Sequence, residues 1–218
     1  MNVLKAKLTT MTDNFTNFRN FMHLPETGGG DAYYVIELVR RGKDHPDLPA
    51  ANYHFKNYYI DTLDKYDRVQ DEIRMLCSTL RMRAYVSVNR KSFRRATLGT
   101  IAEMSRRAAL DDYRRPYAVF DSVSGKDLDK DDKLWIVDID DCPFNIRSSV
   151  QKRASVIRVI NGCEPEGCKL ETMLPTRTGA HLITRPFNLG QFQLRCMEEL
   201  GFVPDVQKNH LTLLFEDL

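Results

Sequence analysis

The feature that most constrains this fold is an apolar run that ends in a cluster of acidic residues. Residues 133–144 are KLWIVDIDDCPF, and the run Leu134–Val137 has the composition of a buried strand. It leads directly into Asp138, Asp140 and Asp141, whose like charges repel one another. These acids either cap a turn at the edge of a sheet or hold a divalent cation. Because side chains two residues apart on a strand share a face, Asp138 and Asp140 form a pair from which Asp141 is excluded.

Around this run, strand-like and helix-like patterns follow one another along the 218 residues. We expect strands at 32–39, 54–60, 84–89, 133–138, 170–174, 180–184 and 210–215, and helices at 61–81, 93–110, 147–160 and 189–200. Asp61 or Thr62 is a suitable cap for the first helix, and Gly201 is a suitable stop for the last one. Residues 117–132 are expected to be mostly linker. The interleaving predicts an α+β fold with a mixed sheet.

The expected domain organisation is a flexible N-terminal segment and one domain. Residues 1–30 are polar and end in Thr27–Gly30, which predicts flexibility, and 31–218 then form the domain. Within it we expect an α/β sublobe at 31–116 and a second sublobe at 117–218. No signal peptide or membrane-spanning run is evident, so we expect a cytoplasmic protein with no membrane partner.

Cysteine usage and charge distribution add two further expectations. Five scattered cysteines suit a reducing compartment, and Cys163 and Cys168 have no nearby partners for a zinc site, so we expect free thiols. Residues 74–116 hold eleven basic residues against three acids, and 117–145 hold eight acids against three lysines. This pattern fits a phosphate-binding surface beside a cation site, but it also fits two solvated faces.

Two later stretches carry further polar side chains. In Pro175–Ile183, alternate positions of an extended chain place Arg177, Gly179 and His181 on one side, where they suit phosphate oxygens. Gly179 would let a phosphate approach the backbone closely. Farther on, Asp205 is followed by Lys208 and Asn209, so a third carboxylate and a cation are available for a triphosphate. Both stretches are equally compatible with ordinary turns.

Together these stretches resemble the archaeo-eukaryotic primase superfamily, which includes primase-polymerases encoded by phages and mobile elements. The first motif of that family is matched by Asp138-Ile139-Asp140, and the second, small-x-His, by Gly179-Ala180-His181. The third, a hydrophobic residue before an acid, is best matched by Pro204-Asp205, with a proline where an aliphatic residue is usual. Glu216 or Asp217 is the alternative third acid.

The resemblance implies a template-dependent nucleotidyltransferase, a primase or polymerase acting on DNA or RNA. Its fold would be an RRM-like catalytic module joined to a small N-terminal α/β unit. Two Mg²⁺ or Mn²⁺ ions would be held by Asp138, Asp140 and Asp205, and the NTP or dNTP by His181, Arg177, Gly179, Lys208 and Asn209. Template and primer would meet a basic segment that includes Arg90, Lys91, Arg94 and Arg95.

Three alternatives remain. In the first alternative, the chain is a nucleic-acid-binding protein with the same fold but without nucleotidyltransferase activity, because a fold does not guarantee an activity. Alternatively, Val137–Asp141 is the nucleophile motif of a haloacid-dehalogenase-type phosphatase that uses Asp138, although its usual partner residues are not evident. A two-histidine phosphoesterase would use His210-Leu211-Thr212, but the sequence offers no second unit of that type.

Overall fold

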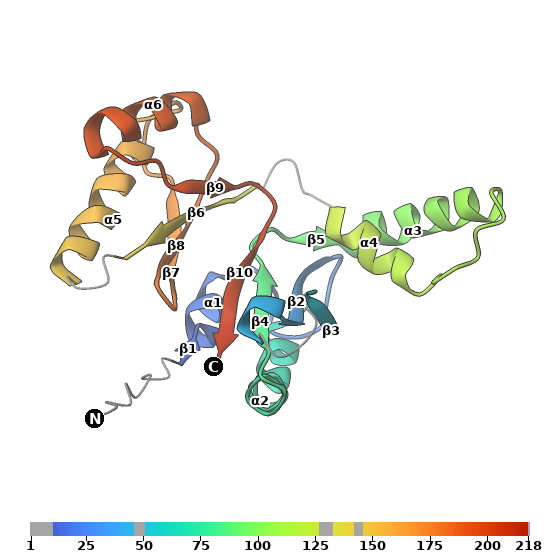
Figure 1. Ribbon diagram of the computed structural model, residues 1–218. Helices are drawn as coiled ribbons and strands as arrows, with labels where there is room; N and C mark the ends of the chain where they lie inside the picture. The colour runs from blue at the N-terminus through green and yellow to red at the C-terminus, as the bar shows by residue number, and fades with distance from the viewer. Residues whose placement is uncertain (1–10, 46–50, 127–132, 142–145, 218) are drawn as a thin grey trace.

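The computed structural model describes residues 11–45, 51–126, 133–141 and 146–217. Within them, the strands form two antiparallel sheets, which confirms a mixed α/β protein (Figure 1). The large sheet has the order β1-β10-β4-β2-β3, and β5 pairs with β2. Its strands are β1 (Thr12–Asp13), β2 (Ala32–Arg40), β3 (Tyr53–Ile60), β4 (Arg83–Ser87), β5 (Lys91–Ser92) and β10 (Leu211–Glu216). The small sheet has the order β7-β8-β6-β9, from β6 (Trp135–Asp140), β7 (Leu170–Thr176), β8 (Gly179–Thr184) and β9 (Asp205–Gln207).

The four expected helices are present close to their expected positions, and two further helices, α1 and α4, accompany them. They are α1 (Phe15–Phe21), α2 (Leu63–Leu80), α3 (Phe93–Ala108), α4 (Ala118–Lys126), α5 (Ile146–Asn161) and α6 (Leu189–Leu200), with a 3-10 turn η1 (Gly42–Asp44). Thr62 caps α2, because its hydroxyl oxygen accepts the backbone N–H of Lys65 at 3.1 Å. Gly201 ends α6 in the left-handed conformation, with φ of 74°, as the sequence predicted.

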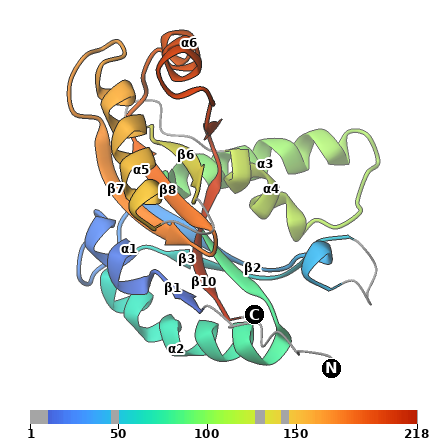
Figure 2. The same ribbon diagram turned by 60° about the vertical axis from the view of Figure 1, so that its left-hand side comes forward.

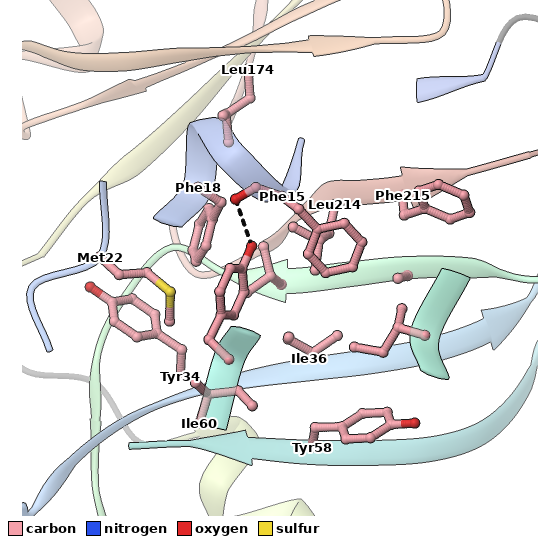
Figure 3. Packing of buried hydrophobic residues seen from close by; sticks show 14 of the residues in the cluster. Phe15, Phe18, Met22, Tyr34, Ile36, Tyr58, Ile60, Leu174, Leu214 and Phe215 are labelled. Carbon is pink, nitrogen blue, oxygen red and sulfur yellow. Dashed lines mark hydrogen bonds between the residues drawn. The ribbon is translucent and has the colours of Figure 1, made fainter. Parts of the chain in front are cut away.

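The N-terminal segment differs from the expectation. Of residues 1–30, only 11–30 lie within the described part, and they contain α1, which packs with α2 against one face of the large sheet (Figure 2). Phe15 and Phe18 are fully buried, and Figure 3 shows both rings above Ile36 and Tyr34 of β2. The spacing of these phenylalanines is that of one helix face, so α1 belongs to the core rather than to a flexible segment.

The two faces of the small sheet belong to different hydrophobic clusters. Trp135, Val137 and Ile139 point toward α5 and α6, with which they form one hydrophobic cluster. Ile136 and Ile183 point the other way, into the cluster that also contains α1 and the large sheet. Leu174 of β7 joins that cluster and extends toward α1 in Figure 3. The two sheets therefore share one core along part of their contact.

The boundary between the expected sublobes is not the boundary between the sheets. β10 lies near the C-terminus, yet it pairs with β1 and β4 of the large sheet, not with the strands that precede it. Its residues from Thr212 to Glu216 are all buried, so it needs neighbours on both sides and on both faces. The chain from 117 onward consequently contributes to both sheets.

Two helices near the middle of the chain have features that the sequence did not predict. Residues 118–126, expected to be linker, form α4, which lies beside α3 (Figures 1 and 2) and packs on the large sheet through Phe120, whose ring contacts Tyr59 of β3. The apolar residues at helical spacing along α3 are largely exposed: Leu98, Ile101 and Met104 face solvent, while Ala96 is buried. The side of α3 that faces α4 carries Gly99, whose Cβ position would lie 2.7 Å from a methyl group of Val123.

The remaining expectations concern cysteines and membranes. Cys77, Cys163, Cys168 and Cys196 are free thiols, while Cys142 and the acidic residues in 127–132 lie outside the described residues. Over the described ranges, no helix has both the length and the apolar character needed to cross a membrane.

Candidate metal and nucleotide site

The sheet pairing places three of the expected site residues in one row. β6 lies between β8 and β9, and the register pairs Asp138 with His181 on one side and with Asp205 on the other. Directly paired residues of antiparallel strands project from the same face. That face is the one opposite α5 and α6, because the alternate residues Val137 and Ile139 are buried beneath those helices. Residues far apart in sequence thus meet on the face that looks toward the large sheet.

Asp138 and His181 are in close electrostatic contact. The Nε2 atom of His181 lies 3.5 Å from Oδ1 of Asp138, and its Nδ1 atom lies 2.9 Å from the hydroxyl of Thr212 on β10. Burial raises the pKa of Asp138; His181 opposes this shift, while Asp140 and Asp205 add to it. Burial lowers the pKa of His181, an effect that Asp138 opposes and His210 reinforces. The site therefore holds a carboxylate crowded by others beside a neutral imidazole.

Asp140 and Asp141 have different surroundings, as strand periodicity predicted. Asp140 is exposed, and its Oδ1 accepts a weak hydrogen bond from the Thr178 hydroxyl at 3.3 Å. Asp141 is engaged by Arg153 of α5, which donates to Oδ1 at 2.6 Å from Nη2 and at 3.1 Å from Nε. A carboxylate neutralised by a forked arginine is a poor ligand for a metal. Asp138 and Asp140 remain as the pair open to a cation.

The third carboxylate, that of Asp205, lies in the row but does not complete a metal site with three protein ligands. Asp205 is exposed and accepts a hydrogen bond from Nε2 of Gln207 at 2.8 Å. In the part of the chain that the structure describes, no three His, Cys, Asp or Glu side chains are close enough together to hold a metal ion. The donor set that does exist, two carboxylates on one face and open to solvent, fits Mg²⁺, which binds through one or two carboxylates plus phosphates and water.

A cleft of about 830 Å³ lies between this row and the open face of the large sheet. Asp138, Asp140, His181 and Arg177 line one side of it. The opposite side is lined by residues of the large sheet and of the turn after β2, namely Glu37, Val39, Arg41, Lys43, His54, Arg83, Tyr85, Leu211 and Leu213. Its volume is within the range of small-molecule sites. Acids and cations occur on both sides, because Glu37, Asp44 and Glu216 lie with Arg41, Lys43 and Arg83, and Arg177 lies with the aspartates.

Arg177, on the same side of the cleft as Asp138, belongs to an ion network around the buried Glu216. Its Nη1 lies 3.3 Å from Oε1 of Glu216, and Nη2 of Arg83 lies 3.2 Å from the same oxygen. Arg83 also contacts Asp44 at 2.8 Å. Glu216, the alternative third acid, is fully buried and already paired with two arginines. Asp217, the other alternative, accepts a hydrogen bond from Ser78, outside the cleft lining.

Gly179 has a different structural role from the one expected. A Cβ built on it would lie 1.9 Å from the carbonyl oxygen of Ile139, so β8 approaches β6 too closely for any other residue. The side where a Cβ would project is filled by β6, and no phosphate fits there. The requirement for glycine at this position is explained by strand packing.

Lys208 and Asn209 do not join the cleft. The Lys208 ammonium lies over the Trp135 ring, 4.9 Å from its centroid, and Trp135 belongs to the face covered by α5 and α6. Asn209 donates to the carbonyl oxygen of Gly125 at 3.3 Å and lines a neighbouring pocket of about 320 Å³. Strand periodicity could not predict where the side chains of Lys208 and Asn209 point, because both residues follow the end of β9.

The four basic residues expected to meet nucleic acid are dispersed. Lys91 is buried, and its ammonium donates to the carbonyl oxygen of Ser124 at 2.7 Å, which is a structural role. Arg94 and Arg95 are exposed on the first turn of α3, near Asp31. Arg90 lines a separate pocket. These four residues do not form one surface.

Three residues have roles in this site that the sequence did not predict. Thr212 orients His181, His210 lies near that histidine, and Arg83 anchors Glu216. His210 and Thr212 were considered only as one unit of a two-histidine phosphoesterase, and nothing local indicated that β10 pairs in the large sheet.

Comparison of the chain with protein-family models, with curated proteins and with solved structures found no match.

Proposed function

We propose that the protein is a metal-dependent, template-directed nucleotidyltransferase of the primase-polymerase type. The observation that carries this proposal is the row Asp205–Asp138–His181 across three strands. Asp138 and His181 of this row, together with Asp140, line a cleft of about 830 Å³. A pair of carboxylates beside a neutral histidine, opposite cationic side chains, suits a metal-bound triphosphate.

The order of elements around the site supports the proposed fold. The run β6-α5-β7-β8-α6-β9 follows the β-α-β-β-α-β pattern, with both helices on one face of a four-stranded sheet. This is the arrangement expected of an RRM-like module. The large sheet with α1 and α2 corresponds to the expected N-terminal unit, completed here by β10 from the end of the chain.

The residues of the chain have distinct roles in this proposal. Asp138 and Asp140 would hold Mg²⁺ or Mn²⁺, with Asp205 as a further ligand. Two such ions, when bound, supply charge neutralisation on the phosphates and activation of the attacking hydroxyl. Arg41 and Lys43, which line the opposite wall, would meet the triphosphate, and Arg177 would do so from the side that carries the aspartates. Thr212 fixes the ring of His181, which leaves its Nε2 side facing the carboxylates and the incoming phosphates.

The proposal is tested by incorporation of a labelled NTP or dNTP on a primed and an unprimed template, with Mn²⁺ or Mg²⁺. We expect Asp138→Ala/Asp140→Ala to reduce incorporation by at least about 100-fold, because stabilisation of developing charge is the largest catalytic contribution. Asp141→Asn is the matched control, since Asp141 is held by Arg153; assayed below its own unfolding temperature, it should stay within about threefold of wild type.

Two outcomes would favour the alternatives. If the wild type binds DNA or RNA without incorporating nucleotide under any of these conditions, the chain is a binding protein of the same fold. Release of phosphate from a small phosphoester, without a template and lost in Asp138→Asn, would support the phosphatase alternative instead.

A further inference from the structure

One carboxylate that the proposed function does not use lies in the middle of the open face of the large sheet. Glu37 is on β2, between β3 and β4, and its neighbours Ile36 and Leu38 point the other way, into the core. Glu37 lines the cleft of about 830 Å³ and also the adjoining pocket of about 320 Å³. Three further residues line both hollows, namely His54, His210 and Leu211. Glu37 therefore stands at the junction of the cleft and the pocket.

The Glu37 carboxylate keeps capacity to accept hydrogen bonds. Its side chain is 23% exposed and lies in a row across three strands, between Asn57 of β3 and Tyr85 of β4. The Nδ1 atom of His54 lies 3.5 Å from its Oε2, which is too long for a strong hydrogen bond. A carboxylate accepts through both oxygens, and partial burial favours an arrangement in which they are paired. Glu37 is thus suited to a ligand that donates hydrogen bonds.

The order of side chains along β2 indicates which part of a nucleotide meets Glu37. On the face that looks into the cleft, Val35 lines the pocket of about 320 Å³, Glu37 lines both hollows, and Val39 and Arg41 line the cleft. Nη1 of Arg41 donates to the hydroxyl of Tyr85 at 3.3 Å, and Tyr85 is paired directly with Glu37. A phosphate held by Arg41 is therefore separated from Glu37 by one tyrosine side chain. Because ribose is the part of a nucleotide next to its phosphates, the ribose falls at Glu37.

The pocket on the other side of Glu37 suits an uncharged group. Besides Glu37, its charged lining residues are Asp121, which accepts a hydrogen bond from the Tyr59 hydroxyl, and Lys91. Lys91 is buried, and its ammonium donates to the carbonyl oxygen of Ser124. Two carboxylates beside an internally bonded lysine do not favour phosphate. A base fits there better than a phosphate, which gives the order phosphate, ribose and base along β2.

From this order we infer that Glu37 accepts a hydrogen bond from the ribose of a nucleoside triphosphate and makes the protein selective for ribonucleotides over deoxyribonucleotides. The inference rests on the proposed function, because it takes the cleft as the site of a nucleoside triphosphate. The 2′-hydroxyl is a donor that a deoxyribonucleotide lacks. A site that hydrogen-bonds a hydroxyl discriminates against the analogue without it, because the polar group of the site is then left unpaired.

The test is calorimetric titration with ATP and with dATP in the presence of Mn²⁺ and without a template. We expect the wild type to bind ATP at least about tenfold more tightly than dATP, as the loss of one hydrogen bond to a charged group implies. In Glu37→Ala the two affinities should agree within about twofold, and Glu37→Gln should give an intermediate ratio. The ratio cancels any general change in charge or folding. Glu198→Gln, on the exposed surface of α6, is the matched control and should keep the wild-type ratio.

A second pair of nucleotides separates the ribose from the base as the donor. UTP and dUTP, whose base has no amino group, should show the same ratio as ATP and dATP. Equal affinities for ATP and dATP in the wild type, or an unchanged ratio in Glu37→Ala, would overturn the inference and leave the proposed function standing. A ratio confined to the adenine pair would also overturn it. If neither ATP nor dATP binds, the proposed function fails, and the inference fails with it.

Discussion

At the scale of single residues, the central observation is how the repulsion between neighbouring acids is resolved. Asp138 lies on the central strand of the small sheet, with His181 and Asp205 as its paired neighbours. Asp141 is removed from the group by Arg153, and Asp140 is left exposed at the strand end. Strand periodicity alone predicted the separation of Asp141 from the pair. The partner of Asp138 could not be deduced in this way, because it depends on which strands pair.

Glu216 and Asp205, the two acids considered as the third ligand, should differ in how much their substitution changes the free energy of unfolding. Glu216 is buried between Arg83 and Arg177, so Glu216→Gln should lower the free energy of unfolding by about 3–5 kcal/mol, the usual cost of breaking a buried ion pair from one side. Asp205 is exposed, so Asp205→Asn should change it by no more than about 0.5 kcal/mol. Urea denaturation measures both quantities.

Nucleotide incorporation by the same two variants completes this prediction. Asp205→Asn should lose incorporation at least about tenfold, while Glu216→Gln should retain it at temperatures where it is folded. The opposite pattern, a stable but inactive Glu216→Gln together with an active Asp205→Asn, would show that Glu216 is the third ligand.

At the scale of helices and strands, α1 determines how the N-terminal residues contribute. Phe18 is fully buried and contacts Tyr34 edge-on, with ring centroids 5.6 Å apart. We expect Phe18→Ala to lower the free energy of unfolding by about 3–5 kcal/mol, because it leaves a cavity beneath the helix. Leu98→Ala on α3 is the control: Leu98 is 58% exposed and should change it by no more than about 0.5 kcal/mol. Equal effects of the two substitutions would contradict the assigned core.

Most elements of this fold could be predicted from local patterns, and the failures have physical causes. Helix α2 was predicted with Asp61 or Thr62 as its cap, and the strands of the β7–β8 hairpin were predicted from two apolar runs. The short helices α1 and α4 were missed because each lies in a polar, glycine- or aspartate-rich stretch that outweighs a few apolar residues. The apolar spacing of α3 predicted the helix but not the exposure of those residues, because periodicity identifies a face but not what covers it.

At the scale of the whole molecule, the chain crosses between the sheets where the candidate site lies. After β9 completes the small sheet, β10 enters the large one. Its Thr212 contacts His181 of β8, and its Glu216 contacts Arg177 in the turn between β7 and β8. One strand therefore joins both walls of the cleft. No local pattern in the sequence predicts such a crossover, which is why the acidic and histidine motifs were found but the cleft, its opposite wall and its ion network were not.

This crossover also makes the two sheets depend on each other. Asn14, which is fully buried, donates hydrogen bonds from its Nδ2 to the carbonyl oxygens of Pro175 on β7 and Leu213 on β10, at 2.8 and 2.9 Å. Asn14 thus joins the start of α1 to β7 of the small sheet and β10 of the large sheet. A site positioned in this way is preorganised for a ligand that bridges the two sheets.

The most direct test of the central claim is calorimetric titration of the protein with Mn²⁺, in the absence and in the presence of a non-hydrolysable nucleoside triphosphate. We predict that the wild type binds Mn²⁺ and that the triphosphate strengthens this binding. Asp138→Asn/Asp140→Asn should weaken Mn²⁺ binding by at least about tenfold, while Asp64→Asn/Asp71→Asn on the exposed side of α2 should leave it unchanged. A wild type that binds neither ligand, or a double variant at Asp138 and Asp140 that binds Mn²⁺ as the wild type does, would contradict the account.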